Sequence, residues 1–216
     1  MEIKVENLTK TYCKKNREIK VISNFNYIFE SGKLYLIKGE SGKGKTTLLT
    51  LVSLLQRQTE GKIYYNENLV SNLTNEQQCS IRRDKLGVIF QDYNLLDGLT
   101  AIENITLANL CQGKGNKEEI YKKAIEILEK LNMAHRANHY PYEVSGGEQQ
   151  RVGVARALIN EPDILICDEP VSNLDKDNVS TIVEIINKYC HEKGKICIIA
   201  SHEDSFNECA DKVINM

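Results

Sequence analysis

The sequence predicts an α/β fold built on a mostly parallel β-sheet, and three observations point to that class. Short apolar runs of strand length occur at Leu34 to Lys38 and Ile164 to Cys167. Stretches with helical spacing of apolar residues follow such runs, as over Val179 to Cys190. Glycine-rich turns separate the two kinds of segment. Strands that alternate with helices in this way form a parallel core sheet, here within one domain over residues 1–216.

The N-terminal third contributes mainly strands. Ile3 to Tyr12 and Val21 to Phe29 have strand composition, and the polar, basic segment Lys14 to Arg17 joins them as a solvated hairpin tip, so this part is expected to be antiparallel. A strand at Leu34 to Lys38 is followed by the glycine-rich segment Gly39 to Gly44. A helix from Lys45 to about Leu55 is expected next, and further strands at Lys62 to Tyr65 and Leu86 to Phe90.

The middle of the chain, roughly residues 92–160, is expected to be a helical insertion into this core. Helical patterns occur over Ala101 to Leu110, Asn116 to Leu131 and Gly146 to Ile159. The α/β pattern then resumes with the strand at Ile164 to Cys167, the helix at Val179 to Cys190 and a strand at Lys195 to Ala200.

Composition excludes several kinds of protein. With 28 basic and 30 acidic residues, the net charge is −2, which argues against nucleic-acid binding driven by phosphate neutralisation. No apolar run approaches the length of a membrane span, so no direct membrane insertion is expected. Seven cysteines without a C-x-x-C pair are typical of free thiols in a reducing cytosol. His135 and His139 could share one helix face, but no third metal ligand lies nearby in sequence.

The segment Gly39 to Thr46 matches the phosphate-loop pattern G-x-x-x-x-G-K-[ST] at every fixed position. Its glycines let several backbone N–H groups turn inward, where they and the helix N-terminus can bind phosphate oxygens. Lys45 adds a positive charge near the β- and γ-phosphates, and the Thr46 hydroxyl can bind Mg²⁺. Lys43 is a second cation, which either faces solvent or adds a phosphate contact. The expected nucleotide-binding residues here are Gly39, Glu40, Ser41, Gly42, Lys43, Gly44, Lys45, Thr46 and Thr47.

Two acids, Asp168 and Glu169, follow the buried strand that ends at Cys167. The carboxyl end of a parallel strand lies beside the phosphate loop, so Asp168 can reach the Mg²⁺ region, with a water molecule between them. Glu169 can accept a proton from an attacking water, which hydrolysis of ATP requires. This pairing predicts a nucleotide-hydrolysing site. A small phosphate-loop kinase is a rival class, which phosphorylation of an added nucleoside monophosphate would reveal.

Val144 to Arg151, with Ser145, Gly146, Gly147 and Glu148, resembles the L-S-G-G-Q signature of the ATP-binding-cassette (ABC) ATPases, although Glu148 stands where that motif has Gln. Ser145 and Glu148 also form an S-x-x-E capping box. The resemblance covers essentially the whole chain. It implies the ABC ATPase fold, with an antiparallel β-subdomain and an inserted helical subdomain, and a signature that contacts the γ-phosphate bound by a partner subunit.

Other positions match the family motif by motif. Tyr12 matches the aromatic residue that stacks on adenine, and its alternative is ordinary packing on a strand face. Gln91 matches the Q-loop glutamine that touches Mg²⁺ and the attacking water. Asp175, in Ser172 to Asp175, matches the D-loop at the dimer interface. His202 matches the histidine that holds the γ-phosphate. The resemblance thus implies Glu169, His202, Lys45 and Gln91 as catalytic residues and Thr46, Gln91 and Asp168 at the metal.

Phe90 to Leu96 and Gly147 to Leu158 look most like the branch that serves lipoprotein release, macrolide and peptide-antibiotic export, and cell division. The resemblance implies an ATPase, with ATP and Mg²⁺ as cofactors, that forms an ATP-dependent homodimer and drives an integral membrane permease. The permease would hold it at the cytoplasmic face of the cell membrane, with Asp92 to Leu99 as the candidate docking segment. An alternative is an ABC ATPase that signals to a cell-wall hydrolase without moving a solute.

Overall fold

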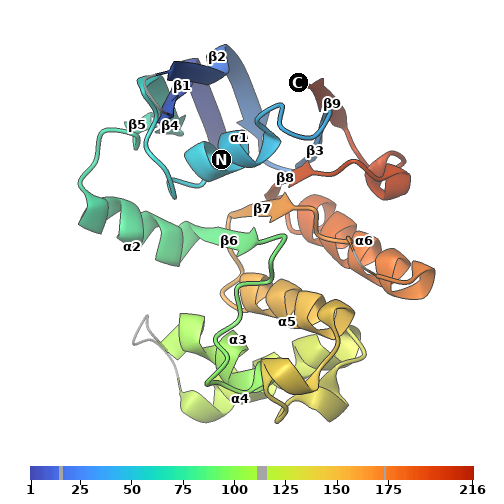
Figure 1. Cartoon of the computed structure of the whole chain (residues 1–216). Coiled ribbons are helices and arrows are strands. Elements are labelled where there is room, and N and C mark those ends of the chain that lie inside the picture. The colour runs from blue at the N-terminus through green and yellow to red at the C-terminus, as the bar shows by residue number, and fades with distance from the viewer. Residues whose placement is uncertain (15–16, 111–115, 173) are drawn as a thin grey trace.

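The computed structural model describes residues 1–14, 17–110, 116–172 and 174–216, in two β-sheets and a set of helices (Figure 1). One sheet is antiparallel and the other is parallel. The α/β fold with a parallel core sheet is therefore confirmed, and so is the antiparallel N-terminal part.

The antiparallel sheet has the strand order β2-β1-β4-β5. Strand β1 pairs with β2 on one side and with β4 on the other, and Ile3 lies opposite both Phe29 and Tyr65. Ile3, Val5 and Leu8 are buried, which fixes the face that turns inward. The expected tip of the hairpin includes residues 15 and 16, which lie outside the described ranges. The strands are β1 (Glu2–Lys14), β2 (Arg17–Glu30), β4 (Glu60–Tyr65) and β5 (Asn68–Leu69).

The parallel sheet has the strand order β6-β7-β8-β3-β9. Every residue of β8 is buried, as are four of the five residues of β7, because helices or the other sheet cover both faces. Since all five strands run the same way, their carboxyl ends lie along one edge. The strands are β3 (Lys33–Lys38), β6 (Leu86–Ile89), β7 (Ile164–Asp168), β8 (Ile196–Ala200) and β9 (Lys212–Asn215).

Two apolar cores lie on the two faces of the parallel sheet. Ile37 faces the core that holds α1 (Lys45–Val52) and the inner side of the antiparallel sheet, so α1 is enclosed between the sheets (Figure 1). Its neighbour Leu36 faces the other core, which contains residues of α5 and α6. The remaining helices are α2 (Asn75–Lys85), α3 (Ala101–Leu110), α4 (Lys117–Lys130), α5 (Gly146–Leu158) and α6 (Lys176–His191).

Helices α3, α4 and α5 lie together on the side of the parallel sheet away from the antiparallel sheet (Figure 1). Their mutual contacts bury Ile105, Ala124 and Leu128 completely. These are the helices expected between residues 92 and 160. That this segment forms a subdomain within a single domain stays a prediction.

Several boundaries differ from those expected. The helix after the phosphate loop ends at Val52 instead of Leu55, and β6 ends at Ile89 before Phe90. His135 lies in a short 3₁₀ helix, η1 (Ala134–Arg136), and His139 lies beyond it, so the two do not share a helix face. Within the described ranges, no group of three or more His, Cys, Asp or Glu side chains could hold a metal ion.

Two expectations from composition can also be compared with the structure. None of the helices in the described ranges combines the length and hydropathy that crossing a bilayer requires. The six cysteines that the structure describes are free thiols. Cys167, Cys190 and Cys197 are buried, Cys209 is half-buried, and Cys13 and Cys79 are exposed.

Candidate active site

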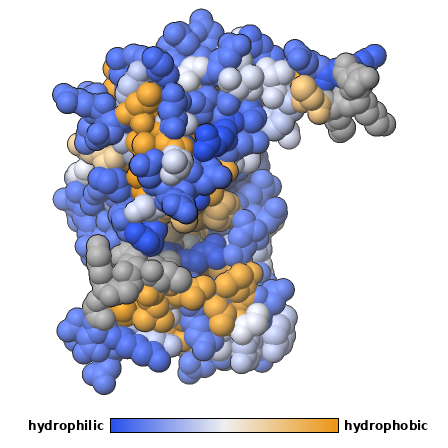
Figure 2. All heavy atoms as spheres, turned by 90° about the vertical axis from the view of Figure 1, so that its left-hand side faces the viewer, coloured by the Kyte–Doolittle hydropathy of each residue, from blue (hydrophilic) through white to orange (hydrophobic). Residues whose placement is uncertain are grey.

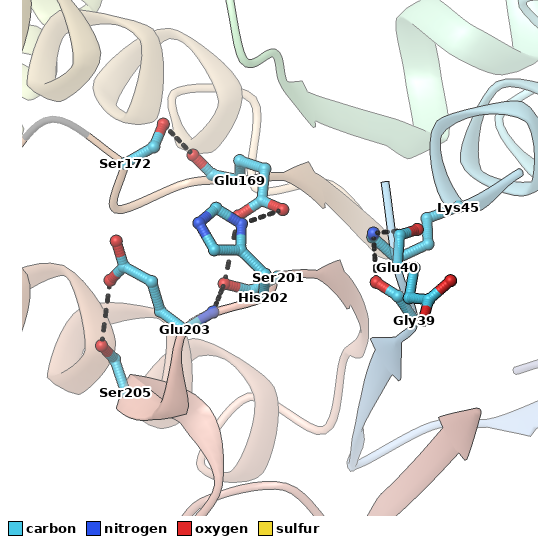
Figure 3. Close-up of polar contacts among 9 residues, drawn as sticks. All are labelled: Gly39, Glu40, Lys45, Glu169, Ser172, Ser201, His202, Glu203 and Ser205. Atoms are coloured by element: carbon cyan, nitrogen blue, oxygen red, sulfur yellow. Dashed lines mark hydrogen bonds and ion pairs between the residues drawn. The ribbon is translucent and has the colours of Figure 1, made fainter. Parts of the chain in front are cut away.

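The phosphate loop joins the carboxyl end of β3 to the N-terminus of α1 and wraps around the Lys45 side chain. The Lys45 ammonium donates hydrogen bonds to the carbonyl oxygens of Gly39, at 2.7 Å, and Glu40, at 3.2 Å (Figure 3). The lysine is thus already held within the loop, with its charge where phosphate oxygens would enter. Backbone N–H groups at the start of α1 and the helix dipole favour an anion at the same place.

Gly44, the N-cap of α1, shows why the loop needs glycine. Its φ of 96° lies in the left-handed region, which residues with a Cβ rarely adopt. A Cβ there would lie 2.8 Å from Val21 Cγ1 and 3.2 Å from the Val21 carbonyl oxygen. Strand β2 therefore presses against the loop and fixes its path.

Asp168 ends β7 and faces the loop. Burial raises the pKa of Asp168, whereas a hydrogen bond with Thr46 and the charge of Lys45 act in the opposite direction. The neighbouring Glu169 carboxylate also raises it. A carboxylate and a hydroxyl in contact are hard oxygen ligands of the kind that Mg²⁺ prefers. Asp168 and Thr46 therefore fit a magnesium site beside the loop.

Glu169 is held in one position by both its backbone and its side chain. It is 6% exposed, and its φ of 48° is unusual for a residue with a Cβ. Its N–H donates to the Ala200 carbonyl at 2.9 Å, which ties it to the end of β8. His202 Nδ1 lies 2.8 Å from Oε1, and the Ser201 hydroxyl donates to Oε2 at 3.2 Å (Figure 3).

His202 is the more exposed residue of this pair, and 67% of its side chain is accessible to solvent. The hydrogen bond with Glu169, reinforced by the charge of that carboxylate, raises the pKa of His202. Because Nδ1 faces a carboxylate, it carries a proton, and Nε2 is left to face outward. The pair can therefore offer a carboxylate to a water molecule and an imidazole with a raised pKa to an anion.

These residues line one pocket of about 620 Å³ at the carboxyl edge of the parallel sheet. Tyr12 and Lys43 are not among its lining residues. The Tyr12 hydroxyl donates to Gln56 Oε1 at 2.7 Å, and Lys43 Nζ lies 3.8 Å from a Glu40 carboxylate oxygen. The lining consists of Val21, Gly39, Glu40, Ser41, Gly42, Gly44, Lys45, Thr46, Thr47, Gln91, Asp168, Glu169 and His202.

The signature segment lies at a second pocket of about 750 Å³. Ser145 is the N-cap of α5, and the predicted capping box is present: Ser145 Oγ accepts from the Glu148 N–H, and Glu148 Oε2 accepts from the Ser145 N–H. Asp175 is the N-cap of α6 at the same pocket. The lining consists of Tyr93, Ser145, Gly146, Gly147, Glu148, Arg151, Leu174, Asp175 and Asn178. Asn173, within the predicted D-loop, lies outside the described residues.

The two pockets have no lining residue in common, but α5 connects them. Gln150, in the middle of α5, is completely buried, and its Nε2 donates to the Pro170 carbonyl at 2.9 Å. Pro170 directly follows Glu169. The helix that begins at the signature therefore also supports the turn that carries Glu169.

Sequence reasoning missed several residues at these pockets. Ser201 precedes His202 and contacts Glu169, yet a lone serine after a strand carries no pattern. Tyr93 lies two residues after Gln91, and its hydroxyl lies 3.0 Å from where a Cβ on Gly146 would be. Arg151 is 8% exposed at the second pocket and ends the signature segment, so its position in the motif was a usable signal.

The sequence profile of the ABC transporter family matches residues 22–172. The chain belongs to the ABC transporter family. This match spans the phosphate loop, the signature segment and both carboxylates, whereas Asp175 and His202 lie beyond it. The ABC ATPase fold and ATP hydrolysis follow from this membership.

Solved structures of an ABC cassette, MJ0796, superpose on this ABC ATPase almost completely. One is described as a dimeric structure of a bacterial ABC transporter cassette and matches with a TM-score of 0.96 at 35% identity, covering 99% of this chain and 94% of that one. Another is described as a post-hydrolysis state bound to ADP and Pi and has a TM-score of 0.95. MJ0796 of Methanocaldococcus jannaschii is 37% identical over 215 residues, 98% of this chain and 92% of the relative.

Two further relatives carry functional names. The lipoprotein-releasing system ATP-binding protein LolD of Treponema denticola is 35% identical over 207 residues, 96% of this chain and 91% of the relative. The putative hemin import ATP-binding protein HrtA of Staphylococcus aureus is 36% identical over 216 residues, 100% of this chain and 97% of the relative.

Proposed function

We propose that two copies of this ABC ATPase enclose two ATP·Mg²⁺ molecules and drive an integral membrane permease that exports or extracts a lipoprotein, peptide or antibiotic. The observation that carries the proposal is that one chain holds two separate half-sites. The phosphate loop and carboxylates line one pocket, and the signature lines another. A second copy, turned to face the first, would bring a signature pocket to each phosphate loop.

Within each site, the residues divide the work. Lys45 and the loop amides bind the phosphates, and Thr46, Gln91 and Asp168 hold Mg²⁺, which neutralises phosphate charge when bound. Tyr12 extends these contacts. Lys43 extends them too if its side chain turns away from Glu40. The Glu169 carboxylate accepts a hydrogen bond from the attacking water and takes its proton, while His202 stabilises charge on the γ-phosphate. Ser145, Gly146 and Gly147 of the second copy contact the same phosphate, with Glu148 and Asp175 beside them.

The proposed direction of transport and the proposed cargo draw on relatives whose names indicate different cargoes. LolD is named for lipoprotein release, which agrees with the branch that the motifs resemble. HrtA is named for hemin import, so the names alone do not agree on a cargo. The extended similarity of Phe90 to Leu96 and Gly147 to Leu158 to the release and export branch favours extraction from the membrane.

A face of the helical part offers a place for the permease. Figure 2 shows hydrophobic side chains gathered on the lower, helical part of the face that looks left in Figure 1. Leu96, in the candidate docking segment Asp92 to Leu99, is 51% exposed, and Leu107 and Leu110 of α3 are 38% and 40% exposed. Leu96 follows Gln91 by five residues, so a membrane partner bound to these exposed apolar residues would lie on the segment that leads from the site. Such a partner would keep the ATPase at the cytoplasmic face of the membrane.

The experiment uses a tagged Glu169→Gln protein, in which ATP binding persists but the water is no longer activated. With ATP, this protein is expected to elute as a dimer and without ATP as a monomer. Recovered with ATP from detergent-solubilised membranes, it is expected to bring down a multi-span permease, identified by mass spectrometry. A monomer at saturating ATP would contradict the two-copy site, and recovery of soluble partners alone would contradict the transporter role. Lys45→Ala, which loses ATP binding, is the matched control.

A further inference from the structure

A carboxylate lies unexpectedly close to the phosphate-binding end of the signature helix. Glu148 is the third residue of α5, beside the amides of Gly146 and Gly147, where the proposed two-copy site would admit a γ-phosphate. The pKa of Glu148 is lowered to about 2. The largest cause is a hydrogen bond from the Ser145 backbone amide, and the Ser145 hydroxyl and Arg136 add to it. At neutral pH the Glu148 side chain is therefore negatively charged, at a place where the negatively charged γ-phosphate would bind.

Arg136 supplies the direct counter-charge to this carboxylate. Its Nε lies 2.9 Å from Glu148 Oε1, while the other oxygen, Oε2, accepts from the Ser145 N–H at 2.8 Å and the Ser145 hydroxyl at 3.0 Å. The Glu148 side chain is 15% exposed and that of Arg136 is 35% exposed, so solvent screens the pair only in part. Each carboxylate oxygen therefore has its own partner, one cationic and one on the signature serine.

The guanidinium is itself held from its other side. Arg136 Nη1 lies 3.3 Å from His139 Nε2. Since a guanidinium can only donate, His139 Nε2 is the acceptor in this contact. Arg151 also attracts Glu148 electrostatically, but no hydrogen bond joins these two described side chains. Arg136 is thus the cation that orients Glu148.

We propose that Arg136 is a positioning residue for the signature half-site: it neutralises Glu148 and holds that carboxylate on Ser145, so that the α5 amides of Gly146 and Gly147 can donate hydrogen bonds to a γ-phosphate. The inference rests on the proposed two-copy site. It assigns a role to a residue outside the signature, 12 positions before Glu148 in sequence and on a different element.

The test measures ATP-dependent dimerisation in the Glu169→Gln background. Adding Arg136→Gln leaves the Glu148 charge unpaired, and the ATP concentration for half-maximal dimer is expected to rise about tenfold. Adding Glu148→Gln as well removes the repelling charge and is expected to restore dimerisation to within about threefold of the starting protein. This rescue distinguishes charge neutralisation from a merely structural contact.

Two controls accompany this series. Lys123→Gln breaks an ion pair with Glu161, at 3.2 Å, that lies away from the signature, and no change is expected. Binding of a fluorescent ATP analogue by the monomer is expected to stay constant, because Arg136 does not line the pocket of Lys45. Arg136→Lys keeps the charge and is expected to change dimerisation by less than about threefold, which provides the test if Arg136→Gln does not fold.

Each result bears on the proposal. Unchanged dimerisation of the Arg136→Gln protein would overturn it, as would a loss that Glu148→Gln does not restore, or a tenfold loss from Arg136→Lys. Failure of the Glu169→Gln protein itself to dimerise would overturn the two-copy function, and this inference with it. An intact Glu169→Gln dimer with an unaffected Arg136 series would overturn the inference alone.

Discussion

Glu169 combines a strained backbone with a side chain in which each carboxylate oxygen has one partner. A left-handed conformation costs a residue with a Cβ about 1–3 kcal/mol, and at Glu169 the amide bond to Ala200 and the Ser172 contacts to its carbonyl hold that conformation. His202 and Ser201 then fix the two carboxylate oxygens. The geometry suits a base that must meet a water molecule in one orientation.

Where the sequence marks residues by contiguous patterns, the structure brings them together, since most of the phosphate loop and the acids after β7 line one pocket. The phosphate loop and the acids after β7 are short, ordered patterns whose chemistry can be identified directly. Ser201 and Arg136 could not be identified in this way, because their partners, Glu169 and Glu148, lie on other elements. Only the fold brings such pairs together.

His191 forms a second titratable contact, far from the site. Its Nε2 lies 2.9 Å from Asp211 Oδ2 and its Nδ1 lies 3.0 Å from the Asn187 carbonyl, so both nitrogens face acceptors and the imidazolium satisfies both. The hydrogen bond with Asp211 raises the pKa of His191 despite partial burial. Asp211 also accepts from the Leu34 N–H, which joins the end of α6 to the start of β3.

We predict that this contact stabilises the protein in mildly acidic solution. Because the folded pKa of His191 is raised, the contribution is present below the unfolded value of about 6.5 and is lost as pH rises through the folded pKa. Both side chains are about one-third exposed, so the effect is expected to be below about 1 kcal/mol, or roughly 1–3 °C in Tm. Thermal melts of His191→Gln should show the larger loss at pH 5.5 and almost none at pH 9.

A Tm loss from His191→Gln that is equal at the two pH values would contradict the charge argument.

At the scale of elements, periodic apolar patterns located most α-helices and β-strands, but three of those that the structure describes were missed. Helix α2 has a single buried residue, Gln78, and therefore no apolar stripe to detect. Its usable signal is the capping box of Thr74 and Gln77. Strands β5 and β9 are too short to show a pattern. Strand β9 forms by pairing with β3, on the side of β3 that does not pair with β8.

Gly87 marks a close approach between the parallel sheet and the signature helix. It lies in β6, and a Cβ there would lie 2.4 Å from the Ala157 carbonyl oxygen of α5 and 2.8 Å from Pro162 Cγ. The strand leading to Gln91 and the helix starting at Ser145 are therefore in backbone contact. No sequence pattern showed this, because a single glycine in a short strand has several possible explanations.

Gly87→Ala is predicted to destabilise the protein by about 1–3 kcal/mol, since the backbone of α5 must shift to admit the methyl group. Urea denaturation measures this change. Gly98→Ala is the matched control: no atom lies within 4 Å of a Cβ at that position, and a change within about 0.5 kcal/mol is expected. Equal effects of the two substitutions would mean that the contact at Gly87 carries no strain.

At the scale of the whole molecule, the two separate pockets lead to a prediction about mixtures of two variant proteins. Lys45→Ala removes one half-site and Ser145→Arg blocks the other, so each protein alone is expected to be almost inactive. A mixed dimer would contain one complete site, formed by the Lys45 of one copy and the Ser145 of the other. An equal mixture is therefore expected to recover up to about a quarter of the wild-type ATPase rate.

Phosphate release measures this recovery over a range of mixing ratios. Lys45→Ala mixed with a Lys45→Ala/Ser145→Arg protein contains no complete site and is the control. Activity of the first mixture equal to the sum of its components would mean that each chain hydrolyses ATP without a neighbour.

The hydrogen bond from Gln150 to the Pro170 carbonyl has a consequence for how two sites share one cycle. In the proposed dimer, helix α5 would meet the neighbour's nucleotide at its first turn, and one turn later it supports the peptide that follows the chain's own Glu169. A tilt of α5 when the neighbour's phosphate arrives would be passed to the turn at Glu169 through the completely buried Gln150 amide. We therefore expect the rate of hydrolysis at one site to depend on whether the other site holds ATP.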